Sequence, residues 1–152
     1  MIYFIDNLDL MDDSELIKLG EAFSAEAKVG KFDVDAFKKS MEIPLLRGSA
    51  GLWIAENDDS ELIGILGGMR TPLFFNTSVV AIEMFWYVHP QHRGGTVGFR
   101  LLEEFERWAR GSGVDAIHLA YIEGVHDEKM KGFYERRGYT KLETIYRKQL
   151  WQ

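Results

Sequence analysis

Residues 79–111, VVAIEMFWYVHPQHRGGTVGFRLLEEFERWARG, form the stretch that decides the fold. Its first part, Val79 to Val88, is almost all β-branched or aromatic, which is typical of a central strand covered on both faces. His89-Pro90 ends this strand, because proline donates no ladder hydrogen bond and restricts the residue before it. After the turn RGGTVG, apolar residues recur at helical spacing up to Gly111. The stretch therefore predicts a strand, a glycine turn and a helix in direct succession.

The rest of the chain also mixes helices with strands. Periodic apolar residues and turn-forming residues predict a strand, two helices and a hairpin before this stretch, and a strand, a helix and a strand after it. No shift in composition suggests a second domain, so we expect one α/β (α+β) domain over residues 1–152. The expected elements are a strand over Ile2 to Ile5, helices over Asp12 to Ala27 and after Asp33, a hairpin between Gly51 and Met69, a strand over Asp115 to Tyr121, a helix over His126 to Arg137 ended by Gly138, and a strand over Tyr139 to Leu150.

Composition argues against several classes of protein. No apolar run reaches the roughly 18 residues of a membrane span, and the N-terminal MIYFIDNLDLMDD is unlike a signal peptide, so we expect a cytoplasmic protein. The absence of cysteine removes disulfides and a cysteine nucleophile. A formal charge of −6 argues against a general nucleic-acid binder and favours a cationic or amine partner. The four histidines have no metal-like spacing, so we expect no metal site.

The turn Arg93 to Gly98 is a candidate anion site. The first amides of a helix have no internal partner and carry partial positive charge, so a phosphate group can bind there. Gly94 and Gly95 let the backbone approach a phosphate, Arg93 adds a cation, and Gly98 leaves the first helical turn open to a bulky ligand. Taken alone, the turn fits a tight structural loop equally well. Neither GxGxxG nor GxxxxGK[ST] matches it, which argues against dinucleotide dehydrogenases and P-loop enzymes.

Two segments resemble the GNAT family of N-acetyltransferases. The stretch FWYVHPQHRGGTVGFRLLEEFERWAR resembles the family's core strand, its VxP turn and its acyl-CoA signature [Q/R]xxGx[G/A]. FYERRGY resembles the family's helix that ends in a tyrosine and a Gly-aromatic pair. Both occur in the family's order, and the resemblance covers roughly Gly51 to the C-terminus. Thr96 departs from the signature's inner glycine, while Asp127 and Met130 stand where many members have Asn and Ala.

The resemblance implies a V-shaped mixed sheet of six to seven strands flanked by about four helices. The central strands would splay apart where the Val79 to Val88 strand ends, and the front helices would lie on the acceptor side. Main-chain groups of Tyr87 and Val88 would pair with the pantetheine arm of acetyl-CoA, and an N–H of the same strand would polarise the thioester. A hydroxyl at position 96 could cap the helix or bond the ligand. The implied diphosphate site consists of Arg93, Gly94, Gly95, Thr96, Val97, Gly98 and Phe99.

Two residues are candidate catalytic groups. By resemblance, Tyr134 matches the tyrosine that faces the CoA sulfur, where its phenol could protonate the leaving thiolate; the alternative is an aromatic residue packed on the sheet. Glu83 interrupts an apolar strand, where desolvation raises the pKa of a carboxylate and makes it a better base. Because Glu83 alternates with Phe85 and Tyr87, we expect all three on one face. A structural partner for an arginine or for backbone amides is an equally good interpretation of Glu83.

Other residues are weaker candidates for a role in catalysis or binding. His118 is a second candidate base, although a structural histidine is the simpler interpretation. His89 and His92 flank the turn and would support it or touch phosphate. The apolar connection TPLFFNTS, residues 71–78, could cover an acceptor pocket or form a dimer contact, with plain packing as the simpler alternative.

Together these features predict an N-acetyltransferase that moves the acetyl group of acetyl-CoA to a primary amine by direct attack in a ternary complex. The acceptor would be a small molecule or a protein amine, with no metal, nucleic acid or membrane involved, and a homodimer is compatible with the sequence. Two other interpretations stay open. One is an acyl-CoA-binding module with little catalysis, and the other is a structural or partner-binding protein that reuses the fold.

Overall fold

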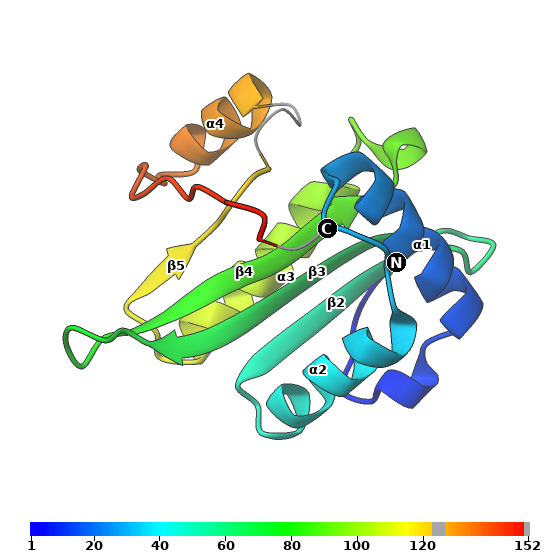
Figure 1. Ribbon diagram of the computed structural model, residues 1–152, viewed down its shortest axis with the longest axis horizontal. Helices are drawn as coiled ribbons and strands as arrows, with labels where there is room; N and C mark the ends of the chain where they lie inside the picture. The colour runs from blue at the N-terminus through cyan, green and yellow to red at the C-terminus, as the bar shows by residue number, and fades with distance from the viewer. Residues whose placement is uncertain (123–126, 151–152) are drawn as a thin grey trace. The chain divides into compact units, whose positions relative to one another are not determined.

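The computed structural model describes residues 1–122 and 127–150 (Figure 1). The chain divides into two compact units, Met1–Ala120 and Tyr121–Gln152. The first unit contains β1 (Ile2–Phe4), a 3-10 turn (Leu8–Leu10), α1 (Asp13–Ala27), α2 (Val34–Leu46), β2 (Ala50–Glu56), β3 (Leu62–Pro72), β4 (Val79–Val88), a second 3-10 turn (Pro90–His92), α3 (Val97–Gly111) and β5 (Ala116–His118), and the second unit contains α4 (Asp127–Arg136).

Both front helices start at an aspartate that caps them. Asp12 accepts hydrogen bonds from the backbone N–H groups of Ser14 and Glu15 at 2.8 and 3.2 Å. Asp33 accepts one from the N–H of Ala36 at 2.9 Å. These carboxylates satisfy amides that a helix start leaves without partners, and their negative charge suits that end of the helix dipole. The sequence expectation for these two helices is therefore confirmed, with Asp12 as the cap and not the first helical residue.

The strands form one mixed five-stranded sheet in the order β1-β2-β3-β4-β5. Neighbouring strands run antiparallel except β4 and β5, which run parallel. The predicted mixed fold is confirmed, but the predicted six to seven strands are too many for the described residues. The expected strand Tyr139–Leu150 is wrong, since no residue of 139–150 is in a strand and Leu142, Ile145, Tyr146 and Leu150 are exposed. Those apolar residues do not alternate cleanly, and a strand needs a ladder partner.

Helices cover both faces of the sheet in the first unit, with α1 and α2 on the viewer's side in Figure 1 and α3 behind it. Consecutive glycines of β3 admit one aromatic ring from each face. A Cβ on Gly67 would lie 2.2 Å from the ring of Phe85, and a Cβ on Gly68 would lie 2.3 Å from the ring of Phe105. Phe85 in turn contacts Phe37 of α2, with ring centroids 5.5 Å apart. Of the α3 face predicted from helical spacing, Leu101, Leu102, Phe105 and Ala109 are fully buried, whereas Val97 and Trp108 are half-buried.

The second unit contains α4 and the segment that follows it. The predicted helix His126–Arg137 is observed as Asp127–Arg136, with His126 outside the described residues. Gly138 follows with a φ of +87°, a conformation that glycine adopts without steric cost, and so ends the helix as expected. No helix among the residues described is long and apolar enough to cross a membrane.

Candidate active site

The sheet opens along β4. The parallel ladder with β5 covers only Val80–Ile82, whereas the ladder with β3 continues to Val88. The N–H of His89 donates to the carbonyl of Ile63 at 2.9 Å. Because bonded residues alternate along an antiparallel ladder, the backbone groups of Tyr87 point toward β3 and those of Val88 point toward the open edge. Of the two expected pantetheine partners, Val88 therefore has the required backbone orientation and Tyr87 does not.

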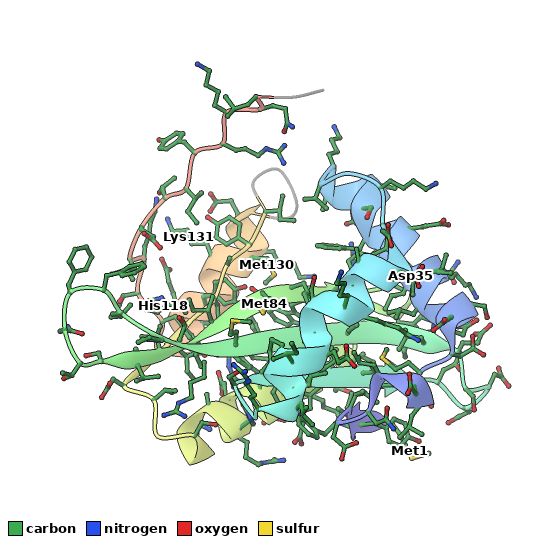
Figure 2. The ribbon with its side chains drawn as sticks, turned by 60° about the horizontal axis from the view of Figure 1, so that its bottom comes forward. Met1, Asp35, Met84, His118, Met130 and Lys131 are labelled. Atoms are coloured by element: carbon green, nitrogen blue, oxygen red, sulfur yellow. The ribbon has the colours of Figure 1, made fainter. Side chains whose placement is uncertain are left out.

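A β-bulge sets the direction of Glu83. Gly67 pairs with Phe85 and Gly68 pairs with Glu83, so Met84 is an extra residue on β4. Figure 2 labels Met84 on this strand. Gly68 lies against Phe105 of α3, and residues opposite each other in a ladder share a face. Glu83 therefore lies on the α3 face, opposite Phe85. The prediction that Glu83 shares a face with Phe85 and Tyr87 is wrong, because the bulge shifts the two-residue period by one.

Glu83 is buried, with 8% of its surface exposed. Its Oε2 accepts a hydrogen bond from the backbone N–H of Ala120 at 3.1 Å. Burial raises the pKa of Glu83 to about 7, and the hydrogen bond from Ala120 partly opposes this shift. A carboxyl group with this pKa exchanges protons near neutrality, as a general base must. The same bond also fits the alternative in which Glu83 holds a backbone amide.

The other candidate base, His118, is half-buried at the end of β5. Its register partner on β4 is Ile82, the residue before Glu83. The structure thus places both candidate bases where β4 and β5 part. His89 and His92 lie near each other beside the glycine turn, with ring centroids 6.2 Å apart.

The glycine turn presents a row of backbone amides at the start of α3. Gly94 has a φ of +84°, and the helix begins at Val97. Among the described residues, the N–H groups of 94–98 have no acceptor, whereas the N–H of Arg100 already donates to the carbonyl of Thr96 at 2.9 Å. Thr96 is the N-cap residue, but its side chain makes no capping bond, so of the two roles considered for its hydroxyl the helix cap is not observed. The row of amides is the arrangement that binds a diphosphate.

Gly98 lies against the end of strand β4. A Cβ at this position would lie 3.5 Å from Trp86 and 3.5 Å from Val88, which is ordinary van der Waals contact. A side chain at position 98 would therefore face β4, and the expectation that Gly98 leaves the first helical turn open to a ligand stays a prediction. Gly95 has open space instead, because a Cβ there would meet nothing within 4 Å.

Substitution of the two glycines should give opposite results. Gly94→Ala forces a side chain into the left-handed region, so we expect it to cost about 1–2 kcal/mol of stability and to weaken CoA binding. Gly98→Ala should cost no stability and leave CoA binding unchanged, because its Cβ fits and alanine has the better helix propensity. Thermal unfolding and calorimetric titration with CoA would test this pair, and equal losses in both variants would contradict it.

Arg93 is engaged by a partner that the sequence did not reveal. Its Nη1 and Nη2 donate to the two carboxylate oxygens of Glu26, at the end of α1, at 2.6 and 2.7 Å. Its Nε donates to the carbonyl of Val88 at 2.8 Å, and its guanidinium lies over the ring of Tyr87, 5.1 Å from the centroid. One feature of the sequence could have indicated this ion pair. The last turn of α1 contains an acid and no base, against the helix dipole, so this acid needed a cationic partner.

The cluster fixes the protonation states of its members. The Tyr87 hydroxyl donates to Glu26 at 3.1 Å, and burial together with Glu26 raises the pKa of Tyr87 to about 12. Hydrogen bonding to Glu26 also raises the pKa of Arg93. Tyr87 therefore stays neutral and Arg93 stays charged at physiological pH.

Tyr134 lies in the second unit, on α4. Its side chain is buried, with 8% of its surface exposed. Within this unit its ring packs near those of Tyr121, Phe133 and Tyr139, with centroids 6.3, 6.1 and 5.9 Å away. The backbone N–H of Tyr139 donates to the carbonyl of Tyr134 at 3.0 Å, which closes the turn after α4.

A cavity of about 330 Å³ lies on the α1 and α2 side of the first unit. Its walls are mostly apolar and come from both helices, the loop between them and strands β3 and β4. Because Phe85 of β4 is one of its walls, the cavity adjoins the opened part of the sheet. The other lining residues include Leu19, Phe23, Ser24, Lys31, Phe32, Asp33 and Phe37.

The connection from residue 71 to residue 78 does not pack against the described part of the chain at its tip. Phe74 and Phe75 are 101% and 97% exposed, so the packing interpretation is wrong for these two rings. Among residues 1–122 and 127–150, no group of three or more His, Asp or Glu side chains could hold a metal ion.

An opened sheet beside a row of bare amides defines an acyltransferase-like site, and the comparisons agree. The chain belongs to the acetyltransferase (GNAT) family, whose model matches residues 18–139. The resemblance stated from the two sequence segments is therefore confirmed. The comparison with curated protein sequences finds no match.

Solved structures share the fold at low sequence identity. An aminoglycoside acetyltransferase from an uncultured soil metagenomic sample has a TM-score of 0.75 and 17% identity, with 99% of this chain and 97% of that chain covered. A Trypanosoma brucei acetyltransferase has a TM-score of 0.71 and 18% identity, with 99% and 100% covered. A ribosomal-protein-alanine N-acetyltransferase from Brucella melitensis has a TM-score of 0.69 and 20% identity, with 99% of each chain covered.

Proposed function

We propose that the protein is an N-acetyltransferase that transfers the acetyl group of acetyl-CoA to a primary amine by direct attack in a ternary complex. The observation that supports this most is the row of amides at 94–98, which lies directly after the strand whose edge has parted from β5. We also propose that residues 1–152 form a single domain, because the family match runs across both compact units.

The donor site follows from the position of these backbone groups. The N–H groups of Gly94, Gly95, Thr96, Val97, Gly98 and Phe99 would hold the diphosphate, where the dipole of α3 adds favourable charge. The end of β4, at Tyr87 and Val88, would lie along the pantetheine arm, with the backbone of Val88 as the pairing group. Arg93 would contribute to the donor site as the first residue of the glycine turn. No metal takes part in this proposal.

The transfer needs a base and an acid. Acetyl-CoA supplies an acetyl group already activated as a thioester. Glu83 accepts a proton from the attacking amine, directly or through water, while a new C–N bond forms and the C–S bond breaks. Tyr134 gives its phenolic proton to the sulfur of the leaving CoA. A backbone N–H at the opened edge of β4 would stabilise the charge on the carbonyl oxygen.

Several observations favour an amine acceptor. Two of the structural relatives are named as acting on an aminoglycoside and on an alanine of a ribosomal protein, and both acceptors are amines. The net charge of −6 attracts cationic amines and repels nucleic acid. We therefore propose a small-molecule or protein amine as acceptor, a cytoplasmic location, and no nucleic-acid or membrane partner. The exposed Phe74 and Phe75 are compatible with a homodimer contact.

Release of CoA thiol from acetyl-CoA, measured against a panel of amines, tests this function. The panel should contain an aminoglycoside, a polyamine, free amino acids and a peptide with an N-terminal alanine. We expect steady thiol release with at least one class. Tight acetyl-CoA binding without release would favour a binding module, and no measurable binding would favour a structural protein that reuses the fold.

A further inference from the structure

Glu26 and Arg93 join two parts of the first unit that are 67 residues apart in the sequence. Glu26 lies in the last turn of α1, and Arg93 is the first residue of the glycine turn. The pair is bidentate, and each side chain is only 27% exposed. Charge-assisted bonds of this geometry are among the stronger polar contacts in proteins. Helix α1 is therefore held to the start of the turn.

Arg93 also holds the end of β4. Its Nε donates to the carbonyl of Val88 at 2.8 Å, while both terminal nitrogens donate to Glu26. The side chain thus spans from the strand before the turn to the helix beside it, with the ring of Tyr87 beneath it. The same residue's backbone N–H donates to Pro90 at 3.3 Å. These contacts fix the first residue of the turn on both sides.

This geometry distinguishes two possible roles of Arg93. The two roles predict opposite effects of Glu26 on donor binding. If the guanidinium bound the diphosphate directly, Glu26 would compete with the donor, because it neutralises the charge of Arg93 and occupies one N–H of each terminal nitrogen. If the guanidinium instead braces the turn, Glu26 would assist the donor. The second role fits the observed bonds, because the amides of 94–98 can bind an anion while the pair stays intact.

Building on the proposed function, we propose that Glu26 is a positioning residue for donor binding. It holds Arg93 against the carbonyl of Val88, and this brace keeps the turn in the shape that exposes its amides. Arg93 then acts through the backbone of the turn and not as a ligand of the diphosphate.

Calorimetric titration with CoA tests whether a substitution of Glu26 weakens or strengthens CoA binding. Glu26→Gln should weaken CoA binding about ten-fold, because it removes a charge-assisted bidentate contact. The KM for acetyl-CoA should rise with it, while kcat at saturating donor stays unchanged. Glu21→Gln is the matched control, since Glu21 is an exposed residue of the same helix and the change in charge is the same. CoA binding by Glu26→Gln that is unchanged or tighter than wild type would overturn the proposal.

A double-mutant cycle with Arg93→Met gives a second test. We expect the double variant to lose no more CoA affinity than Arg93→Met alone, because the proposal assigns the effect of Glu26 on donor binding to its bonds with Arg93 and not to its bond with Tyr87. Additive losses would show that Glu26 acts by another route and would overturn the proposal.

Hydrogen exchange without ligand tests the brace separately from the function. The amides of His92 and Arg100, which donate to His89 and Thr96, flank the turn. They should exchange several-fold faster in Glu26→Gln than in wild type or Glu21→Gln. Unchanged exchange would overturn the proposal. If the wild-type protein binds no CoA, the proposed function fails, and this exchange experiment still decides whether Glu26 holds the turn.

Discussion

Replacing Tyr134 with phenylalanine should lower kcat about a hundred-fold and change the affinity for acetyl-CoA less than about two-fold. The substitution removes one hydroxyl group and keeps the ring, which packs among Tyr121, Phe133 and Tyr139. If the phenol protonates the departing thiolate, its loss affects only the transition state. Steady-state kinetics with the best acceptor, together with calorimetric titration of CoA, measure both quantities.

Tyr121→Phe is the matched control for this variant. Tyr121 contributes a ring to the same cluster but is exposed, so removal of its hydroxyl should leave kcat unchanged. A Tyr134→Phe enzyme that works at the wild-type rate would remove Tyr134 from the mechanism and leave only its packing role. A similar melting temperature for both variants would show that any loss of rate is not a loss of folding.

Glu83→Gln should lower activity on the order of a hundred-fold near pH 7–8. A base acts in its deprotonated form, and the pKa of Glu83 is about 7, so the wild-type rate should rise with pH through that value. Glutamine accepts no proton, so the variant should lack this rise. The difference in rate between the variant and wild type should become smaller as the pH approaches the pKa of the amine, because the acceptor is then already neutral. Profiles of kcat/KM against pH measure this, and an inflection near pH 7 that persists in the variant would assign the titration to another group.

The same substitution should change how stability depends on pH. The pKa of Glu83 is raised from 4.5 to about 7, so between these values the folded protein binds more protons than the unfolded chain. Stability therefore falls as pH rises through this window, by on the order of 3 kcal/mol in total. Glu83→Gln removes this loss, so its melting temperature relative to wild type should be higher at pH 8 than at pH 4. An equal difference at both pH values would show that the charge on Glu83 costs no folding energy.

Local sequence patterns predicted the elements that carry the site. The β-branched and aromatic run Val79–Val88, the proline after it and the glycine turn gave β4 and the start of α3 at their observed positions. Asp12 and Asp33 marked the helix starts because their side chains bond amides only two or three residues away. Burial of Glu83 could also be inferred, since apolar neighbours surround it along the strand.

Contacts between distant segments could not be inferred in this way. The bulge at Met84 moves Glu83 to the other face of the sheet, and it appears only in the register between β3 and β4. The partner of Arg93 is Glu26, and any of many acidic residues would have satisfied the sequence. Residues 139–150 were expected to be a strand, but a strand exists only where another strand pairs with it.

The sequence by itself determined the family, the order of strand, turn and helix, and the residues that could carry protons, because these depend on neighbours within a few positions. Only the tertiary structure decided which face Glu83 lies on, which backbone groups the turn leaves bare and what holds Arg93. Those features depend on strand register and on one long-range ion pair, and both arise from packing between segments that lie far apart in the chain.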